Sequence, residues 1–331
     1  MKKNKLKIFF ILLSLICIGS VFVKRGDQIY EYTLSLRKDF ARQREYKRMH
    51  NEDVDISSLK PLRDEKDTWY TKYHYICHGG GGIDGKSYSN SLEGMELAYS
   101  KGNRVYDSDM TFTKDGVLIL RHSWSDNLEQ TDIPMEDSNS FVDQNGHTQH
   151  LLKEKVVMSY KDFMSNKIYK EFTPMDCKAA INFLNTHKDA YIAPDMKDDP
   201  VLSYTYLVEE AKRQNAIETL DRIIVNIYEY ALYDKILKIY PFKNVTIRQH
   251  YVHPNNYNEL IAFCIKNNIH VVNVSSKYAN DEGIKRIQSK GIRVFIAVAD
   301  YISDMKKYKK LGFSGAVTNW LTEDKWNLIE K

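Results

Sequence analysis

Two acidic residues with a spacing of two suggest a cation-binding site. Asp107 and Asp109 lie in an otherwise β-prone segment, 105–110. In a strand, residues two apart point to the same face. Like charges that close repel each other unless a cation or a proton lies between them. Carboxylate oxygens suit Mg²⁺ or Ca²⁺, so the pattern predicts an oxygen-rich metal site, although one aspartate facing solvent at a strand end would look the same.

Three other positions add ionisable side chains at the ends of extended runs. His78 ends the run 75–78 and precedes four glycines, which allow backbone and substrate to approach closely. His122 ends the apolar run 117–122, where a lone histidine is more often structural than catalytic. Asp195 and Lys197 share one face of a further run, and a structural ion pair is the alternative there.

Strand-like and helical patterns alternate from Tyr73 onward. We predict strands at 75–78, 104–110, 191–196, 223–227, 245–249, 270–274, 294–298 and 315–318. We predict helices at 91–100, 201–214, 232–239, 257–266, 282–289 and 303–310. This rhythm favours a closed (β/α)₈ TIM barrel over an open sheet. The irregular stretch of about 125–174 is too long for a simple loop and is predicted to be an insertion over the barrel mouth.

The barrel would bring these side chains together, because active sites of such barrels lie at the carboxyl ends of the strands. Three carboxylates, two histidines and Lys197 would meet at one mouth. Burying so many ionisable groups is costly unless they serve a site.

The order and spacing of these segments resemble the glycerophosphodiester phosphodiesterase family. The resemblance is carried by His78 with its glycines and by segments 90–93, 102–109, 111–116, 120–122, 291–300 and 311–319. It covers about Tyr73 to Trp320. Asn90 and Glu93, which open a helix within it, are predicted mainly to form a capping box.

The resemblance implies a phosphodiester hydrolase with a divalent cation, Mg²⁺ or Ca²⁺. The residues that match the family's site are Asp107, Asp109 and Asp195 as metal ligands, His78 and His122 as general acid and base, and Lys197 as a stabiliser of phosphorane charge. Glycerophosphodiesters are the first expected substrates, followed by lipid head groups and phosphodiester-linked surface polymers.

The sequence departs from the family at three of these places. Gly79 stands where the family has an arginine, which removes a bidentate phosphate donor. Asp107 and Asp195 stand where glutamate is common, which shortens the reach of the carboxylate. Two other functions therefore stay open: a catalytically inactive barrel that binds a phosphate-bearing cell-surface polymer, and a polysaccharide hydrolase that uses the carboxylate pair.

The amino terminus predicts export. Four lysines within residues 2–7 precede an apolar run from Ile8 to Val23, which Lys24 and Arg25 close. We favour an uncleaved signal anchor at 1–25, since 18–21 is a poor cleavage site; a cleaved signal peptide is the alternative. A juxtamembrane helix and linker at 26–70 would lead to the barrel at 71–331, placed outside the cytoplasm by a single-pass membrane helix.

Composition describes a globular protein without an obvious macromolecular partner. The 331 residues are 43% hydrophobic and 28% charged, enough for a core. A net charge of +4 is small for this length, so a nucleic-acid partner is not expected. The four cysteines form no CxxC pair, which argues against a zinc site or a disulfide framework.

Overall fold

The computed structural model describes residues 54–122, 124, 140–142, 148–150, 157–248, 257–279 and 282–330. The chain divides into two units, residues 1–54 and 55–331, and the second holds almost all of the described residues. The predicted anchor and most of the predicted insertion lie outside the described residues. Within the described part, no helix has the length and apolar character needed to cross a membrane.

Eight parallel strands form the frame of the second unit. They are β1 (Tyr75–His78), β2 (Val105–Phe112), β6 (Tyr191–Met196), β7 (Ile224–Ile227), β8 (Asn244–Arg248), β9 (Val271–Ser275), β10 (Arg293–Ala297) and β11 (Gly315–Thr318). Ladders join them in the order β6-β2-β1-β11-β10-β9-β8-β7, and a single bridge between Ile192 and Ile223 joins β6 to β7. The result is a barrel-like α/β fold, as the alternating pattern predicts.

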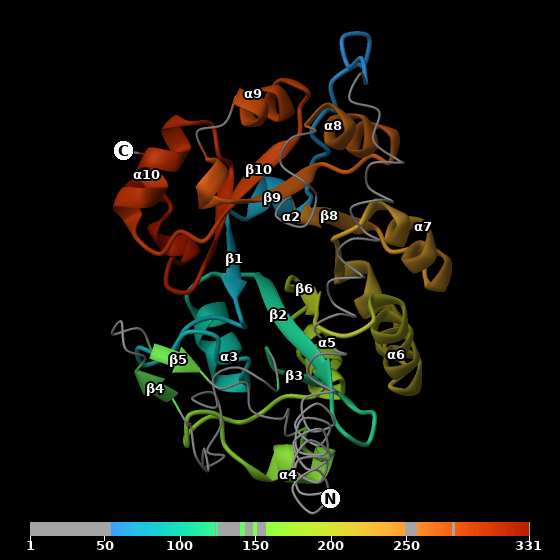
Figure 1. Cartoon of the computed structure of the whole chain (residues 1–331), viewed down its shortest axis with the longest axis vertical. Coiled ribbons are helices and arrows are strands. Elements are labelled where there is room, and N and C mark those ends of the chain that lie inside the picture. The colour runs from blue at the N-terminus through green and yellow to red at the C-terminus, as the bar shows by residue number, and fades with distance from the viewer. Residues whose placement is uncertain are drawn as a thin grey trace, which may run out of the picture. The chain divides into compact units, whose positions relative to one another are not determined.

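Helices follow most of these strands, and α7 to α10 lie around the outside of β8 to β10 in Figure 1. The α-helices are α2 (Trp69–Lys72), α3 (Leu92–Ser100), α4 (Tyr160–Ser165), α5 (Cys177–Thr186), α6 (Pro200–Arg213), α7 (Tyr230–Ile239), α8 (Tyr257–Lys266), α9 (Glu282–Ser289), α10 (Ile302–Lys310) and α11 (Asn327–Glu330). The 3₁₀ helices are η2 (Ile217–Arg222), η3 (Ser276–Tyr278) and η4 (Glu323–Lys325).

Helix α6 illustrates how the sequence sets these boundaries. Asp199 is its N-cap and accepts a hydrogen bond from the backbone amide of Leu202, while Pro200 occupies the first turn, where its missing amide hydrogen costs nothing. Lys212 and Arg213 lie in the last turn, where positive charge suits the helix dipole. The helix therefore begins and ends one residue before the predicted range.

The short helix α2 closes the amino-terminal end of the barrel. Trp69 is 2% exposed and its ring centroid lies 5.8 Å from that of Phe295. It belongs to a buried cluster whose other members come from α2 and from inward-facing strand positions: Tyr70, Ile76, Val105, Ala193, Ile224, Val271, Phe295 and Val317. Apolar side chains thus fill this end of the barrel, which leaves the other end for polar groups.

Three further strands lie outside the ring. Strand β3 (Leu118–Leu120) pairs antiparallel with the end of β2, and β4 (Ser140–Val142) pairs antiparallel with β5 (Thr148–His150). The described end of the predicted insertion contains α4, whose Phe163 is fully buried beside Ile119 of β3. This contact holds the segment before α5 against the strand that leads to His122.

Candidate active site

The predicted acidic residues lie next to each other on neighbouring strands. His78 ends β1 and is the Cα partner of Asp107 on β2, while Asp109 of β2 is the Cα partner of Asp195 on β6. Asp107 and Asp109 are 2% and 3% exposed, so both carboxylates are withdrawn from bulk water. The parallel register therefore places Asp107 beside His78 and Asp109 beside Asp195, all at the carboxyl ends of the strands, as expected for the active-site end of a barrel.

A cavity of about 350 Å³ opens among these strand ends. Its lining combines charged and apolar side chains: His78, Tyr88, Asp109, His122, Asp195, Lys197, Arg248, Ser275, Ala297, Val298 and Val317. In the ring of strands, β10 lies four places from β6, so Ala297 faces the charged wall from across the barrel. The cavity thus has an ionic side and an apolar side.

Lys197 connects two of the carboxylates. Its Nζ lies 2.8 Å from Oδ1 of Asp109 and 2.9 Å from Oδ2 of Asp195. Burial disfavours the charged ammonium, but the two carboxylates outweigh this and raise the pKa of Lys197 above its ordinary value. The side chain therefore stays charged inside the cavity.

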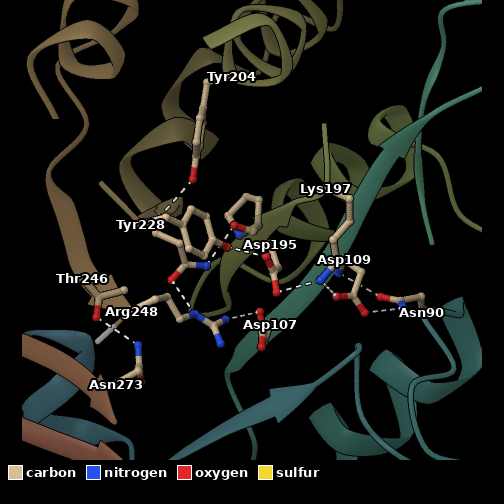
Figure 2. A network of polar contacts seen from close by, with 12 residues as sticks. Asn90, Asp107, Asp109, Asp195, Lys197, Tyr204, Tyr228, Thr246, Arg248 and Asn273 are labelled. Atoms are coloured by element: carbon tan, nitrogen blue, oxygen red, sulfur yellow. Dashed lines mark hydrogen bonds and ion pairs between the residues drawn. The ribbon is translucent and has the colours of Figure 1, made fainter. Parts of the chain in front are cut away.

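Arg248, the last residue of β8, provides a second buried cation. Its Nη2 donates to Oδ1 of Asp107 at 2.6 Å, and its Nε donates to Oδ1 of Asn226 at 3.3 Å (Figure 2). Burial raises the pKa of the Asp107 carboxyl, and Arg248 opposes that shift. The repulsion expected between Asp107 and Asp109 is thus relieved by two protein cations, one on each carboxylate.

Asp195 is held in its ionised form. Burial opposes its charge, but Arg248, Lys197 and a hydrogen bond from the Tyr228 hydroxyl lower the pKa of Asp195 below its ordinary value. Figure 2 shows the resulting chain of contacts from Tyr228 through Asp195 and Lys197 to Asp109. This chain begins directly after β7, passes through β6 and ends on β2.

The ring of Tyr88 packs against both histidines. Its ring centroid lies 4.2 Å from that of His78 and 6.0 Å from that of His122, with edge-to-face geometry in both pairs. Nδ1 of His78 is buried and has no hydrogen-bond partner among the residues that the structure describes. Both imidazoles pack against this one aromatic ring, and all three rings line the same cavity.

The predicted capping box at Asn90 and Glu93 is wrong. Ser91 is the N-cap of α3 and accepts from the amide of Gly94. The Asn90 amide instead donates to Oδ2 of Asp109 at 2.9 Å, and Glu93 accepts two hydrogen bonds from Thr173. A positive φ of 45° turns the Asn90 side chain away from the helix and toward the site.

The sequence also suggests Trp124, Asn226, Tyr228 and His250, which lie at or just beyond strand ends, as residues that line the pocket. Tyr228 bonds Asp195, and Asn226 lies behind Arg248 and also donates to the carbonyl of Pro194. Trp124 donates to the carbonyl of Phe112 and packs on Phe163, so it supports the rim. His250 lies outside the described residues.

Arg248 and Tyr88 were not predicted from the sequence. Arg248 could have been found, because it ends its strand in the same way as His78 ends β1. Tyr88 lies in a loop with a φ of 55°, and no pattern in the sequence signals that conformation.

The three carboxylates are of the chemical type that binds a divalent cation. Their positions do not converge on a single point. Among the described residues, no three His, Cys, Asp or Glu side chains form a metal-binding cluster. Three hard oxygen donors nevertheless lie on two adjacent strands, which is the donor type that Mg²⁺ and Ca²⁺ prefer. The formal charges of the three carboxylates, Lys197 and Arg248 add up to one negative charge.

Comparison with protein families gives a match over the whole barrel. The model of the glycerophosphoryl diester phosphodiesterase family matches residues 78–322, from the first histidine to the loop after β11. The chain belongs to this family. It is accordingly a phosphoric diester hydrolase. A comparison with curated proteins gave no match.

Solved structures share the fold at low sequence identity. A protein from Galdieria sulphuraria superposes with a TM-score of 0.60 at 14% identity, covering 78% of this chain and 98% of its own. A glycerophosphodiester phosphodiesterase from Parabacteroides distasonis gives 0.55 at 15%, covering 78% and 96%. An Oleispira antarctica phosphodiesterase in complex with the product sn-glycerol-3-phosphate gives 0.58 at 12%, covering 77% and 96%. The barrel-like fold of this chain is therefore the fold seen in solved structures that are named as phosphodiesterases.

Proposed function

We propose that this family member hydrolyses glycerophosphodiesters by acid–base catalysis between His78 and His122, with a divalent cation at the carboxylates. The observation that carries the proposal is the cavity itself, where the two imidazoles pack against Tyr88 and face Lys197 and Asp195. A phosphodiester in this cavity would have a proton acceptor and a proton donor within its reach. Such a pair typically contributes about 10²–10⁴-fold to the rate.

The reaction needs two proton transfers. One imidazole takes the proton of the attacking hydroxyl as the new P–O bond forms. If this hydroxyl belongs to water, the diester is hydrolysed directly; if it is the neighbouring hydroxyl of the substrate, a cyclic phosphate forms first, and water then opens it with the same two proton transfers. The other imidazole, in its protonated form, gives a proton to the leaving alcohol oxygen as its P–O bond breaks. Lys197 places positive charge near the phosphoryl oxygens, where negative charge develops.

Asp107, Asp109 and Asp195 are the residues that would hold the cation. When bound, a divalent cation would polarise a phosphoryl oxygen and lower the pKa of a coordinated hydroxyl. The charges support this arrangement: three carboxylates against Lys197 and Arg248 leave one negative charge. With both imidazoles neutral, a divalent cation and a singly charged phosphodiester would bring the formal sum to zero, and the imidazolium that serves as general acid adds one positive charge.

The cavity favours a compact substrate. Its volume of about 350 Å³ is at the lower end of the range of about 300–1,000 Å³ for small-molecule sites. The Oleispira antarctica phosphodiesterase holds sn-glycerol-3-phosphate, and a group of that size is what we propose here. The apolar wall at Ala297, Val298 and Val317 would contact the carbon atoms of the alcohol.

A substrate panel tests this function. Full-length protein, supplied with Mg²⁺ or Ca²⁺, should release alcohol from glycerophosphodiesters, and a chelator should abolish the release. Binding of a phosphate-bearing polymer without turnover would instead indicate an inactive barrel. Sugar release that a chelator does not affect would indicate a polysaccharide hydrolase.

We also propose that residues 1–25 anchor the enzyme and place the barrel outside the cytoplasm. The support is the sequence of lysines, apolar run and closing basic residues at the amino terminus. Protease added to intact cells or spheroplasts should degrade the barrel while the chain stays with the membrane fraction. Protection of the barrel until the membrane is lysed would contradict this topology.

A further inference from the structure

We propose that Arg248 is a phosphate-binding residue of this site, and that it exchanges Asp107 for the phosphoryl oxygens of the substrate. This inference rests on the proposed function, since it assigns the group that holds the anion. It concerns the wall of the barrel opposite the first histidine: β8 lies four places from β1 in the ring of strands.

The hydrogen bonding of Arg248 is incomplete for a buried guanidinium. The side chain is 6% exposed and has five N–H groups. Nη2 uses one of them on Asp107, and Nε uses one on Asn226. Among the described residues, the remaining three N–H groups have no acceptor. Arg248 lines the cavity, and none of its nitrogens is sealed off from it without a partner, so a ligand in the cavity that supplies oxygens would gain these bonds.

The guanidinium also lies where a ligand can reach it. Arg248 lines the cavity together with His78, His122 and Lys197. A phosphodiester between the imidazoles would therefore have the ammonium of Lys197 on the β6 side and the guanidinium on the β8 side. A planar guanidinium can make two parallel bonds to phosphate oxygens, which an ammonium cannot.

Gly79 shows why such a cation must come from elsewhere in the barrel. A Cβ at Gly79 would lie 2.6 Å from Cα of Tyr88, and the φ of Gly79 is 52°. A side chain directly after His78 would displace the Tyr88 backbone and with it the ring that packs against both histidines. Arg248 supplies the cation without disturbing this loop.

The hydrogen bond between Arg248 and Asp107 links binding of the cation to binding of the phosphate. While Arg248 occupies Oδ1 of Asp107, that oxygen is not free for a cation, and the guanidinium is partly engaged. A cation that takes the Asp107 carboxylate would release the guanidinium toward the phosphate. Binding of cation and binding of phosphate should therefore strengthen each other.

Calorimetric titration of inorganic phosphate into the full-length protein tests the assignment without requiring turnover. In the presence of a chelator, Arg248→Gln should weaken phosphate binding by about tenfold or more, the usual effect of losing a charged hydrogen bond. Arg293→Gln is the matched control, because Arg293 begins β10 at the other end of the barrel and pairs with Asp64. Equal phosphate affinity in Arg248→Gln and wild type would overturn the proposal.

A variant of Asp107 tests whether Arg248 leaves Asp107 for the phosphate, and distinguishes this exchange from the effect of removing a negative charge. Asp107→Asn replaces the carboxylate by a neutral amide and so weakens the bond that holds the guanidinium, and phosphate should bind more tightly than to wild type in chelator. In the double variant with Arg248→Gln this gain should disappear, because the group that was freed is absent. A gain that persists in the double variant, or no gain in Asp107→Asn, would overturn the exchange. This comparison also serves if Arg248→Gln alone fails to fold.

A failure of the phosphate-binding role of Arg248 can be told apart from a failure of the proposed phosphodiesterase activity. If wild-type protein binds phosphate through Arg248 but does not cleave glycerophosphodiesters, the assignment of Arg248 stands and the proposed activity fails. If cleavage occurs and phosphate affinity does not depend on Arg248, the activity stands and this inference fails. Addition of Mg²⁺ should tighten phosphate binding to wild type more than to Arg248→Gln.

Discussion

The backbone of Tyr88 occupies the space that a side chain at Gly79 would need. The two residues approach so closely that a Cβ on Gly79 would lie 2.6 Å from Cα of Tyr88. This contact and the φ of 52° at Gly79 explain why a glycine follows His78 directly. It also places the Tyr88 ring against His78 and His122.

Substitution at Gly79 should therefore damage the site even when the new residue restores the family's arginine. Gly79→Ala should cost more than the roughly 1–2 kcal/mol expected for a left-handed backbone conformation alone. Gly79→Arg should lose most of the activity because Tyr88 must move. Denaturant unfolding and hydrolysis rates measure the two effects.

Gly85→Ala is the control for this prediction. Gly85 also has a positive φ, 76°, but its added Cβ would meet nothing within 4 Å. It should show only the backbone cost. Equal destabilisation by Gly79→Ala and Gly85→Ala would mean that the contact with Tyr88 carries no energy.

The closed end of the barrel should depend on Trp69. Its side chain fills the space beneath the inward-facing strand residues, so Trp69→Ala should lower the free energy of unfolding by about 3–5 kcal/mol. Tyr301→Ala, at a residue that is 69% exposed, should change it by less than about 0.5 kcal/mol. Urea titrations of the two variants compare these values, and a small effect of Trp69→Ala would show that α2 is dispensable.

The hydroxyl of Tyr228 should affect how stability depends on pH. The pKa of Asp195 is lowered in the folded protein, so the unfolded state binds its proton first as the pH falls. This contribution to stability is present above the ordinary carboxyl pKa of about 3.9 and is lost as the pH falls through the folded value. Tyr228→Phe removes a hydrogen bond to the carboxylate, moves the folded pKa toward the ordinary value and should reduce this loss.

Urea midpoints at about pH 6 and about pH 3 measure the difference. The fall in stability between the two pH values should be smaller in Tyr228→Phe than in wild type. Tyr301→Phe, on an exposed side chain, should behave as wild type. An unchanged fall in Tyr228→Phe would show that the hydroxyl does not stabilise the Asp195 charge.

Much of this arrangement follows from the sequence by simple rules. The strands 75–78, 191–196 and 315–318 are found at their predicted bounds, and the other five shift by one or two residues. The carboxylates and His78 lie at the same end of the sheet because the strands are parallel and their carboxyl ends share one edge. These features depend on the local residue pattern and on the alternation of strands and helices, and both can be read from the sequence.

The unpredicted parts depend on long-range contacts. Asn90 pairs with Asp109 rather than capping α3, because the loop from Gly79 to Asn90 adopts several left-handed conformations. Arg248 meets Asp107 across the barrel, 141 residues away in sequence. A partner at that distance is fixed by closure of the strand ring, which no local pattern encodes.

We propose that His78 and His122 act together on one phosphodiester. The decisive measurement is the kcat/KM of full-length His78→Ala and His122→Ala on a glycerophosphodiester, with His187→Ala as control. His187 stacks on Phe183 at the end of α5, away from the cavity lining. We expect each site variant to lose about 10²–10⁴-fold while the control stays near wild type. Hydrolysis that continues at the wild-type rate without either imidazole would contradict the account.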